Sequence, residues 1–194
     1  MTQPLKFIAP EEQARANFYA LLARLFYAPP DGALLKVLAE TRLDGEALGP
    51  AWRELSHAAA GTDPEKAREE YEERFVGTGK APVTFYTASY TMRFSNEVPL
   101  AALRSELAAM GLSRQDGVHE PEDHIAALCE VMRHLIAAQR ELSEQQRFFS
   151  KWIAPAAEPL CGAIDKDPGT VFYRHVSRFA RAFFRLEQTA FEML

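Results

Sequence analysis

The chain has 194 residues, 47% of them hydrophobic, and a formal net charge of -5 from 27 acidic and 22 basic residues. This length suffices for one sizeable core or two small helical subdomains. The acidic balance argues against a protein that binds nucleic acid, which would need a dense basic stripe, and makes a basic peptide the more plausible partner.

Neither the cysteines nor the apolar stretches indicate secretion or membrane insertion. Cys129 and Cys161 lack zinc-type spacing, so we expect two small buried side chains in a reducing compartment. The N-terminus lacks the features of a secretory signal. The apolar stretch 148–164 is broken by Lys151, Glu158 and two prolines, so it cannot span a bilayer. We therefore expect a cytoplasmic protein.

Hydrophobic periodicity predicts helices through the first part of the chain. Residues 11–27 carry apolar side chains on one face, and Asp31 is placed to cap the next helix. Trp52 lies on a third predicted helix. The sequence Asp63-Pro64-Glu65 combines a capping carboxylate, a proline at the first helical position and an acid favoured by the helix dipole. It predicts a helix that ends at Gly77.

Residues 77–90, GTGKAPVTFYTASY, interrupt the helical pattern. Glycine and proline predict irregular backbone here, and aromatic residues are unusual in a solvated loop. Long loops of this kind are more often functional than loops in general. The alternative is that the loop tucks into the core and that the aromatics of the preceding helix are ordinary core residues. The aromatics concerned are Phe85, Tyr86 and Tyr90 in the loop, and Tyr71 and Phe75 before it.

Helical spacing resumes with Leu100 and continues to the end of the chain. Ser143 and Gln146 have capping-box spacing, and Asp167-Pro168 repeats the earlier start signal. No alternating strand pattern of useful length is found. We therefore predict an all-α bundle of about nine or ten helices. We expect an N-terminal helical part (1–111), a hinge loop (112–120) and a C-terminal helical part (121–194).

Residues 119–124, HEPEDH, contain three acids and two histidines. As a metal site they supply acceptable ligands, but no HExxH pair places two imidazoles on one helix face. As an acid–base relay they fail, because Asp123 and His124 are adjacent and point in different directions on a helix. No metal and no catalytic residue is therefore predicted.

The same residues are better explained as a helix start. Glu120 is placed to cap, Pro121 has a suitable φ, and Glu122 and Asp123 would face the positive end of the helix dipole. This interpretation leaves His124 unexplained. The sequence GTGK at 77–80 lacks the spacing of a phosphate-binding loop and follows a predicted helix rather than a strand.

Several segments resemble one known family. EPEDH at 120–124 is similar to the E-P-x-D-H hinge motif of the TorD/DmsD redox-enzyme maturation chaperones, which are related to the NarJ-type assembly proteins. YEERFVGTG and FYTASY, within residues 71–90, resemble the aromatic segment of that family. QQRFFSKWIAP and VFYRHVSRFARAFF fit its later helices. The matches follow the family order over nearly the whole chain.

The resemblance implies a helical chaperone without catalysis. Such proteins bind the apo form of a molybdopterin oxidoreductase catalytic subunit, often through its twin-arginine signal peptide, and hold it until cofactor is inserted. The resemblance implies no bound cofactor beyond weak guanine-nucleotide binding, and either a monomer or a domain-swapped dimer. Two alternatives stay open: a NarJ-type assembly factor for a non-exported molybdoenzyme, and a guanine-nucleotide-binding switch.

The resemblance also suggests a peptide-binding site. A twin-arginine peptide offers an arginine pair followed by an apolar segment, so recognition needs carboxylates beside an apolar groove. In this hypothesis Asp123 pairs with an arginine, Pro121 fixes the hinge, and His124 orients the loop or bonds the peptide. Glu120 and Glu122 add charge. The expected site comprises Tyr71, Phe75, Phe85, Tyr86, Ser89, Tyr90, Glu120, Pro121, Glu122, Asp123 and His124.

Overall fold

The structure, a computed structural model, describes residues 8–77, 81–91, 99–114 and 120–194. The described residues form a helical bundle and contain no β-strand beyond one isolated bridge. This confirms the all-α prediction. The helices are α1 (Pro10–Tyr27), α2 (Gly32–Glu40), α3 (Gly49–Gly61), α4 (Pro64–Tyr71), α5 (Ala88–Thr91), α6 (Pro99–Ala109), α7 (Ile125–Ala137), α8 (Leu142–Phe148), α9 (Ala154–Lys166) and α10 (Phe172–Glu192), with π-helical turns η1 (Glu72–Val76) and η3 (Phe149–Ile153).

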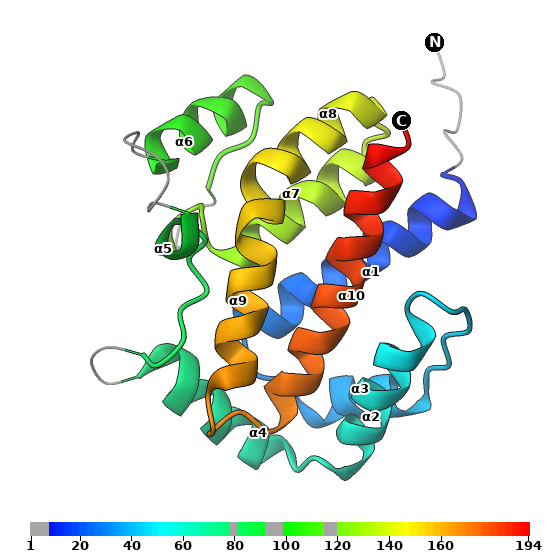
Figure 1. Ribbon diagram of the computed structural model, residues 1–194, viewed down its shortest axis with the longest axis vertical. Helices are drawn as coiled ribbons and strands as arrows, with labels where there is room; N and C mark the ends of the chain where they lie inside the picture. The colour runs from blue at the N-terminus through cyan, green and yellow to red at the C-terminus, as the bar shows by residue number, and fades with distance from the viewer. Residues whose placement is uncertain (1–7, 78–80, 92–98, 115–119) are drawn as a thin grey trace.

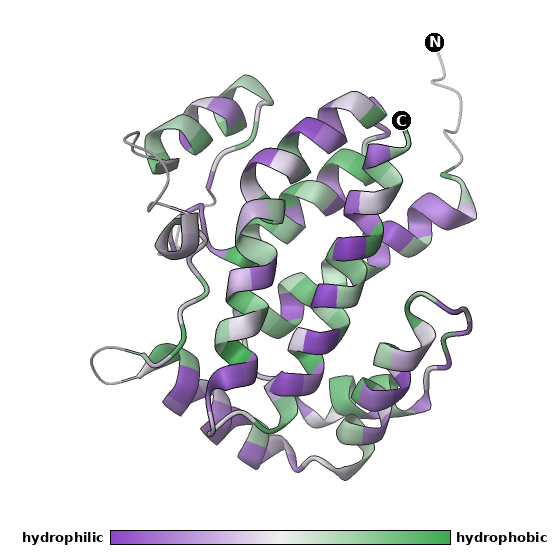
Figure 2. Cartoon of the chain, viewed as in Figure 1, coloured by the Kyte–Doolittle hydropathy of each residue, from purple (hydrophilic) through white to green (hydrophobic). Residues whose placement is uncertain are grey.

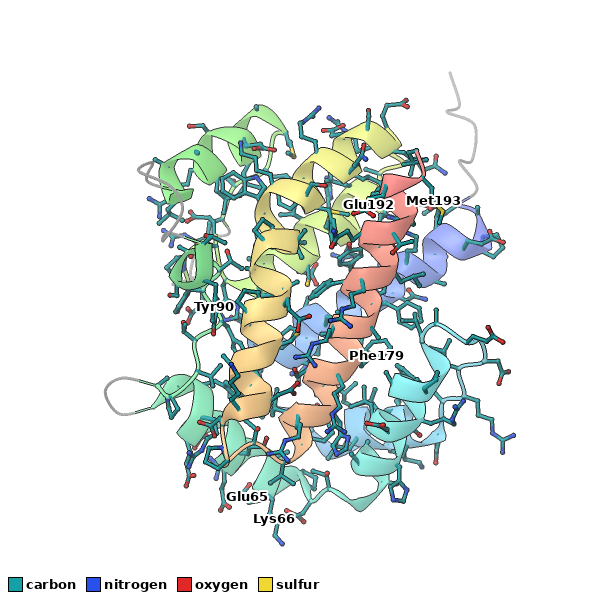
Figure 3. All side chains as sticks on the ribbon, in the orientation of Figure 1. Glu65, Lys66, Tyr90, Phe179, Glu192 and Met193 are labelled. Carbon is teal, nitrogen blue, oxygen red and sulfur yellow. The ribbon has the colours of Figure 1, made fainter. Side chains whose placement is uncertain are left out.

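The long helices form the centre of the bundle. α9 and α10 run side by side, and α1 packs along α7 behind them (Figure 1). α2, α3 and α4 gather near the start of α10. Phe179 lies on α10 (Figure 3). Its ring contacts Trp52 of α3, with ring centroids 5.2 Å apart. Hydrophilic and hydrophobic residues alternate along α9 and α10, so each helix presents both a polar and an apolar side (Figure 2).

One hydrophobic core runs through the described residues. It takes side chains from α1, α3, α7, α9 and α10, and also Val83 and Phe85 from the irregular segment. The predicted parts 1–111 and 121–194 share this core, because α1 packs against α7 and α10. They therefore do not form separate hydrophobic cores. A functional boundary at 112–120 stays a prediction, and residues 115–119 lie outside the described residues.

Other local expectations can be compared directly with the structure. Cys129 and Cys161 are buried free thiols, as expected. None of the described helices combines the length and apolar character that a bilayer crossing requires.

Two predicted helix starts are confirmed by their capping bonds. The Asp31 carboxylate accepts a hydrogen bond from the Leu34 amide at 2.8 Å. The Asp63 carboxylate accepts one from the Glu65 amide at 2.9 Å, and Pro64 opens α4. Each bond satisfies an amide that lacks a partner inside its own helix.

Two other predicted starts are wrong. α8 begins at Leu142 without a side-chain cap, so Ser143 is already inside the helix and cannot form a capping box. Gln146 instead donates to the Phe191 carbonyl at 2.6 Å. The Asp167 carboxylate accepts a hydrogen bond from the Gly169 amide at 2.8 Å. This bond lies in the turn before α10, so Asp167 does not cap that helix.

The N-terminus of α10 is capped by a residue far away in sequence. Both oxygens of the Glu70 carboxylate, on α4, accept hydrogen bonds from the amides of Val171, Phe172 and Tyr173, each at 2.9 Å. These amides have no partners inside their own helix, and the helix dipole favours a negative charge at this end. Glu70 thereby joins α4 to the longest helix.

We expect Glu70→Ala to lower the free energy of unfolding by about 1–2 kcal/mol, because it leaves three amides without their acceptor. Denaturant unfolding followed by circular dichroism measures this loss. Glu69→Ala is the matched control, because Glu69 is an exposed neighbour on the same helix. Equal stabilities of the two variants would contradict the capping role.

Candidate functional site

Residues 120–124, here called the hinge segment, pair with the irregular segment that contains Phe85 and Tyr86. An isolated antiparallel bridge joins Tyr86 to His124. The Thr87 amide donates to the Asp123 carbonyl, and the Ile125 amide donates to the Phe85 carbonyl, both at 2.9 Å. This pairing holds residues 123–125 in position against residues 85–87.

The predicted helix start at Glu120 and Pro121 is wrong. α7 begins at Ile125, and His124 is its N-cap residue. The pairing described above keeps the hinge segment out of the helix, because its backbone groups bond to another part of the chain. The Pro121 carbonyl accepts the His124 amide at 3.1 Å, which closes a turn before α7.

His124 is a buried neutral cap. Its Nδ1 accepts a hydrogen bond from the Ala126 amide at 3.2 Å. Its ring lies edge-on to the rings of Phe85 and Tyr86, at centroid distances of 5.7 Å and 5.3 Å. Burial lowers the pKa of His124 to about 4, although the charge of Glu120 opposes that shift. The imidazole is therefore uncharged at neutral pH, and this suits a capping acceptor.

Asp123 caps a different helix from the one predicted. Its Oδ2 accepts a hydrogen bond from the amide of Ala88, the first residue of α5, at 3.2 Å. The side chain is buried, and burial raises the pKa of Asp123 above its usual range while the Ala88 amide opposes the shift. Pairing of Asp123 with an arginine of a ligand stays a prediction, but the carboxylate is already engaged inside the protein.

The two glutamates of the hinge segment are more accessible than Asp123. Glu122 forms an ion pair with Arg104 of α6, with 2.9 Å between Oε2 and Nε. Glu120 is half-buried and accepts a hydrogen bond from the Tyr86 hydroxyl. Among the described residues, no lysine or arginine forms an ion pair with Glu120. It is therefore the hinge carboxylate best placed to receive a cation from outside.

Beneath the hinge segment lies a group of buried rings, here called the aromatic cluster: Phe26, Tyr71, Phe75, Phe85 and Tyr173. Phe75 and Phe85 stack with centroids 4.4 Å apart, and Phe85 lies 5.1 Å from Phe26. The Tyr71 hydroxyl donates to the Phe26 carbonyl, and the Tyr173 hydroxyl donates to the Leu25 carbonyl, both at 3.0 Å. These two bonds satisfy carbonyls at the end of α1.

The structure does not show the apolar groove that the sequence led us to expect at these rings. Tyr71, Phe75 and Phe85 are buried in the core because they pack against α1 and α10, so they do not line an open surface in this structure. The alternative interpretation from the sequence, that the aromatic loop tucks into the core, describes Phe85 correctly. Direct contact of these three rings with a peptide stays untested.

The remaining predicted residues lie nearer the surface. Tyr86 is half-buried, and Ser89 on α5 is exposed. Tyr90 is half-buried beside α9, and its hydroxyl donates to the Thr84 carbonyl at 2.8 Å (Figure 3). The accessible part of the site thus consists of Tyr86, Ser89, Tyr90, Glu120, Pro121 and Glu122, with Asp123 and His124 beneath them.

Two alternative interpretations of the sequence concern other ligands, a nucleotide and a metal ion. Gly77 has a φ of 57°, which favours glycine, and ends η1, but residues 78–80 of the GTGK sequence lie outside the described residues. His119 also lies outside them. Within the described part of the chain, no three His, Cys, Asp or Glu side chains converge as a metal site.

No pattern in the sequence indicated Arg104 as a partner of the hinge segment. It lies 18 residues before Glu122 on another helix, and no local spacing connects the two. Tyr173 was not expected in the site either, because the hydrophobic periodicity of its helix indicates only a core position. Both contacts arise from packing between segments that are distant in sequence.

Comparison with known proteins agrees with this fold. Residues 42–185 match the family described as nitrate reductase delta subunit. The chain therefore belongs to that family of redox-enzyme maturation chaperones of the NarJ and TorD type. Members of this family are chaperones for the assembly of molybdoenzymes.

One solved structure has the same overall fold. It is a crystal structure of a protein from Archaeoglobus fulgidus, provisionally described as a redox enzyme maturation protein. The TM-score is 0.58 at 18% identity, and the match covers 95% of this chain and 99% of that chain. At this identity the likeness concerns the fold alone. The comparison with curated proteins found no match.

Proposed function

We propose that this protein binds the twin-arginine signal peptide of a molybdopterin oxidoreductase catalytic subunit and holds the apo-subunit until its cofactor is inserted. The observation that carries the proposal is the Glu120 carboxylate, which is partly accessible and has no cationic partner among the described residues. Because cofactor insertion precedes export, we propose that the protein acts in the cytoplasm.

Charge complementarity supports this assignment. A guanidinium presents paired N–H donors that match a carboxylate, and such a bond is stronger than one between neutral groups. The Tyr86 hydroxyl now bonded to Glu120 is a neutral donor that an arginine can replace or join. The half-buried ring of Tyr90 and the partly exposed helix α5 offer a partly apolar surface beside that charge.

The buried residues of the site have a supporting role in this proposal. Asp123 caps α5 and His124 caps α7, so together they hold the two segments that carry Tyr86 and Glu120. The aromatic cluster supports the same segments from below, because Phe85 precedes Tyr86 directly. Binding then requires no opening of the core.

We expect Glu120→Gln to weaken binding of a synthetic peptide that carries an arginine pair before an apolar segment by about 10-fold or more, because a charged hydrogen bond contributes about 1.5–3 kcal/mol. Fluorescence anisotropy with a labelled peptide measures the affinity. Glu40→Gln is the matched control, because Glu40 is an exposed glutamate at the end of α2. Unchanged affinity in Glu120→Gln would refute the assignment of that carboxylate.

The same assay distinguishes two further possibilities. Asp123→Asn keeps a side-chain oxygen for the Ala88 amide, so a large loss of affinity would assign the arginine to Asp123 instead. A second candidate function is assembly of a non-exported molybdoenzyme. The description of the matched family as nitrate reductase delta subunit favours this function. Equal binding of a peptide without the arginine pair would support that function.

A further inference from the structure

The helix α6, which has 11 residues, lies at the edge of the bundle (Figure 1). Among its described side chains, only those of Leu103 and Leu107 are buried. The neighbouring helix in sequence, α7, has 13 residues and buries seven side chains. The free energy of local opening rises with the apolar area that an element buries, so apolar packing holds α6 less firmly than α7.

A single carboxylate joins α6 to the π-helical turn η3. Oε2 of Glu106 accepts hydrogen bonds from the Lys151 ammonium at 2.8 Å and from the Trp152 indole nitrogen at 3.1 Å. The Lys151 ammonium also lies 4.7 Å from the centroid of the Trp152 ring. Adjacent residues of a regular α-helix point in different directions, whereas these two reach one oxygen, and π-helical turns are frequent at functional sites. This contact between Glu106, Lys151 and Trp152 is here called the latch.

The latch leaves part of Glu106 unsatisfied. Its Oε1 is buried and has no hydrogen-bond partner among the described residues. A buried polar atom without a partner costs free energy, and this cost disappears when the atom reaches water. Detachment of α6 therefore breaks two hydrogen bonds but hydrates an unsatisfied oxygen. The latch holds its helix less firmly than the buried carboxylate of Glu187, whose two oxygens are both bonded.

A second contact joins α6 to the hinge segment. Arg104 forms the ion pair with Glu122, and the Arg104 side chain is 53% exposed. Exposed ion pairs contribute little stability and weaken with salt, so a cation from outside can compete with Arg104 for Glu122. Arg104 lies within one turn of Glu106, so both contacts hold the same part of α6.

We infer that α6 is a strap that detaches from the bundle as a unit, held closed by the latch and tied to the hinge segment through Arg104. Detachment uncovers its two buried leucines while the helices beneath stay folded. In the proposed function the peptide carries two arginines, and the one that Glu120 does not hold competes with Arg104 for Glu122. Detachment itself follows from the contacts of α6, whereas its control by the peptide rests on the proposed function.

Native-state hydrogen exchange, measured by mass spectrometry, tests the strap. In the wild type, the amides of α6 should exchange at least about 10-fold faster than those of α7. Glu106→Ala should accelerate exchange in α6 by a further factor of about 10, because it removes two hydrogen bonds to a charged group, and should leave α7 and α10 unchanged. Glu130→Ala, which removes an exposed ion pair with Arg133 on α7, is the matched control and should not affect α6. Equal exchange of α6 and α7 in the wild type, or no acceleration confined to α6 in Glu106→Ala, would overturn the strap.

The same measurement tests the link to the hinge segment. Arg104→Gln should accelerate exchange in α6 by about 2- to 5-fold, as expected for the loss of an exposed ion pair. A synthetic peptide with an arginine pair before an apolar segment should accelerate it in the wild type but no further in Arg104→Gln. A bound peptide that leaves α6 unchanged would overturn the link while the proposed function stands. Failure of the peptide to bind the wild type would overturn the proposed function and the link, whereas Glu106→Ala would still decide the strap.

Discussion

Replacement of Glu187 by alanine is expected to lower the free energy of unfolding by about 3 kcal/mol, because it leaves a largely buried arginine without its main partner. Glu187 lies on α10 and is only 2% exposed. Its two oxygens accept hydrogen bonds from Nε and a terminal nitrogen of Arg15, both at 2.8 Å. Glu187 also accepts the Tyr19 hydroxyl at 2.9 Å. One carboxylate thereby connects α10 to two residues of α1.

The electrostatics of this group agree with the expected loss. Burial alone would lower the pKa of Arg15, but hydrogen bonds to Glu187 and its charge raise the pKa above its ordinary value. The pKa of Tyr19 is raised by burial and then by the charge of Glu187. Arg15 also bonds Glu12 at 2.7 Å, so it keeps one partner after the substitution. This limits the cost to the lower part of the range for broken buried pairs.

Denaturant unfolding of Glu187→Ala beside Glu158→Ala measures the effect. Glu158 on α9 pairs with Arg181 and Arg185, but its side chain is 58% exposed, so its removal should cost less than about 1 kcal/mol. The combined replacement Arg15→Met, Tyr19→Phe and Glu187→Leu should recover most of the lost stability, since no unpaired polar group remains. A loss below about 1 kcal/mol in Glu187→Ala would show that the pair contributes no more than a surface contact.

Titration of His124 is expected to give the second large effect. Its pKa in the folded protein is about 4, compared with an ordinary value of 6.5. Between these values the unfolded chain binds a proton that the folded chain does not, so stability falls as pH falls from 6.5 to 4. At about 1.4 kcal/mol per unit of pKa, the full loss amounts to roughly 3 kcal/mol.

His124→Asn separates this effect from the other titrations. Asparagine is a good N-cap residue and does not titrate, so α7 should still form while the pH dependence between 4 and 6.5 becomes shallower. The ring contacts to Phe85 and Tyr86 are lost at every pH, and this lowers the whole curve without changing its slope. Urea unfolding at several pH values gives the two slopes. His57→Asn, at an exposed position of α3, is the control. Equal slopes in wild type and His124→Asn would contradict the lowered pKa.

The sequence by itself determined the fold class and several helix ends. Side chains such as Asp31 and Asp63 bond amides two or three residues away, so the information for these caps lies within one turn of chain. Hydrophobic periodicity likewise predicts a helix from neighbouring residues. The motif at 120–124 indicated the family for a related reason, because its five residues are consecutive and can be recognised without knowledge of the fold.

The tertiary structure decided what surrounds that motif. The start of α7 depends on pairing between residues 85–87 and 123–125, and the cap of α10 comes from Glu70, about a hundred residues earlier. Whether a ring is buried depends on which helices cover it. Packing against α1 and α10 placed Tyr71 and Phe75 inside, whereas Tyr27 stayed exposed at a helix end. Such contacts join residues distant along the chain, so no local pattern of residue types specifies them.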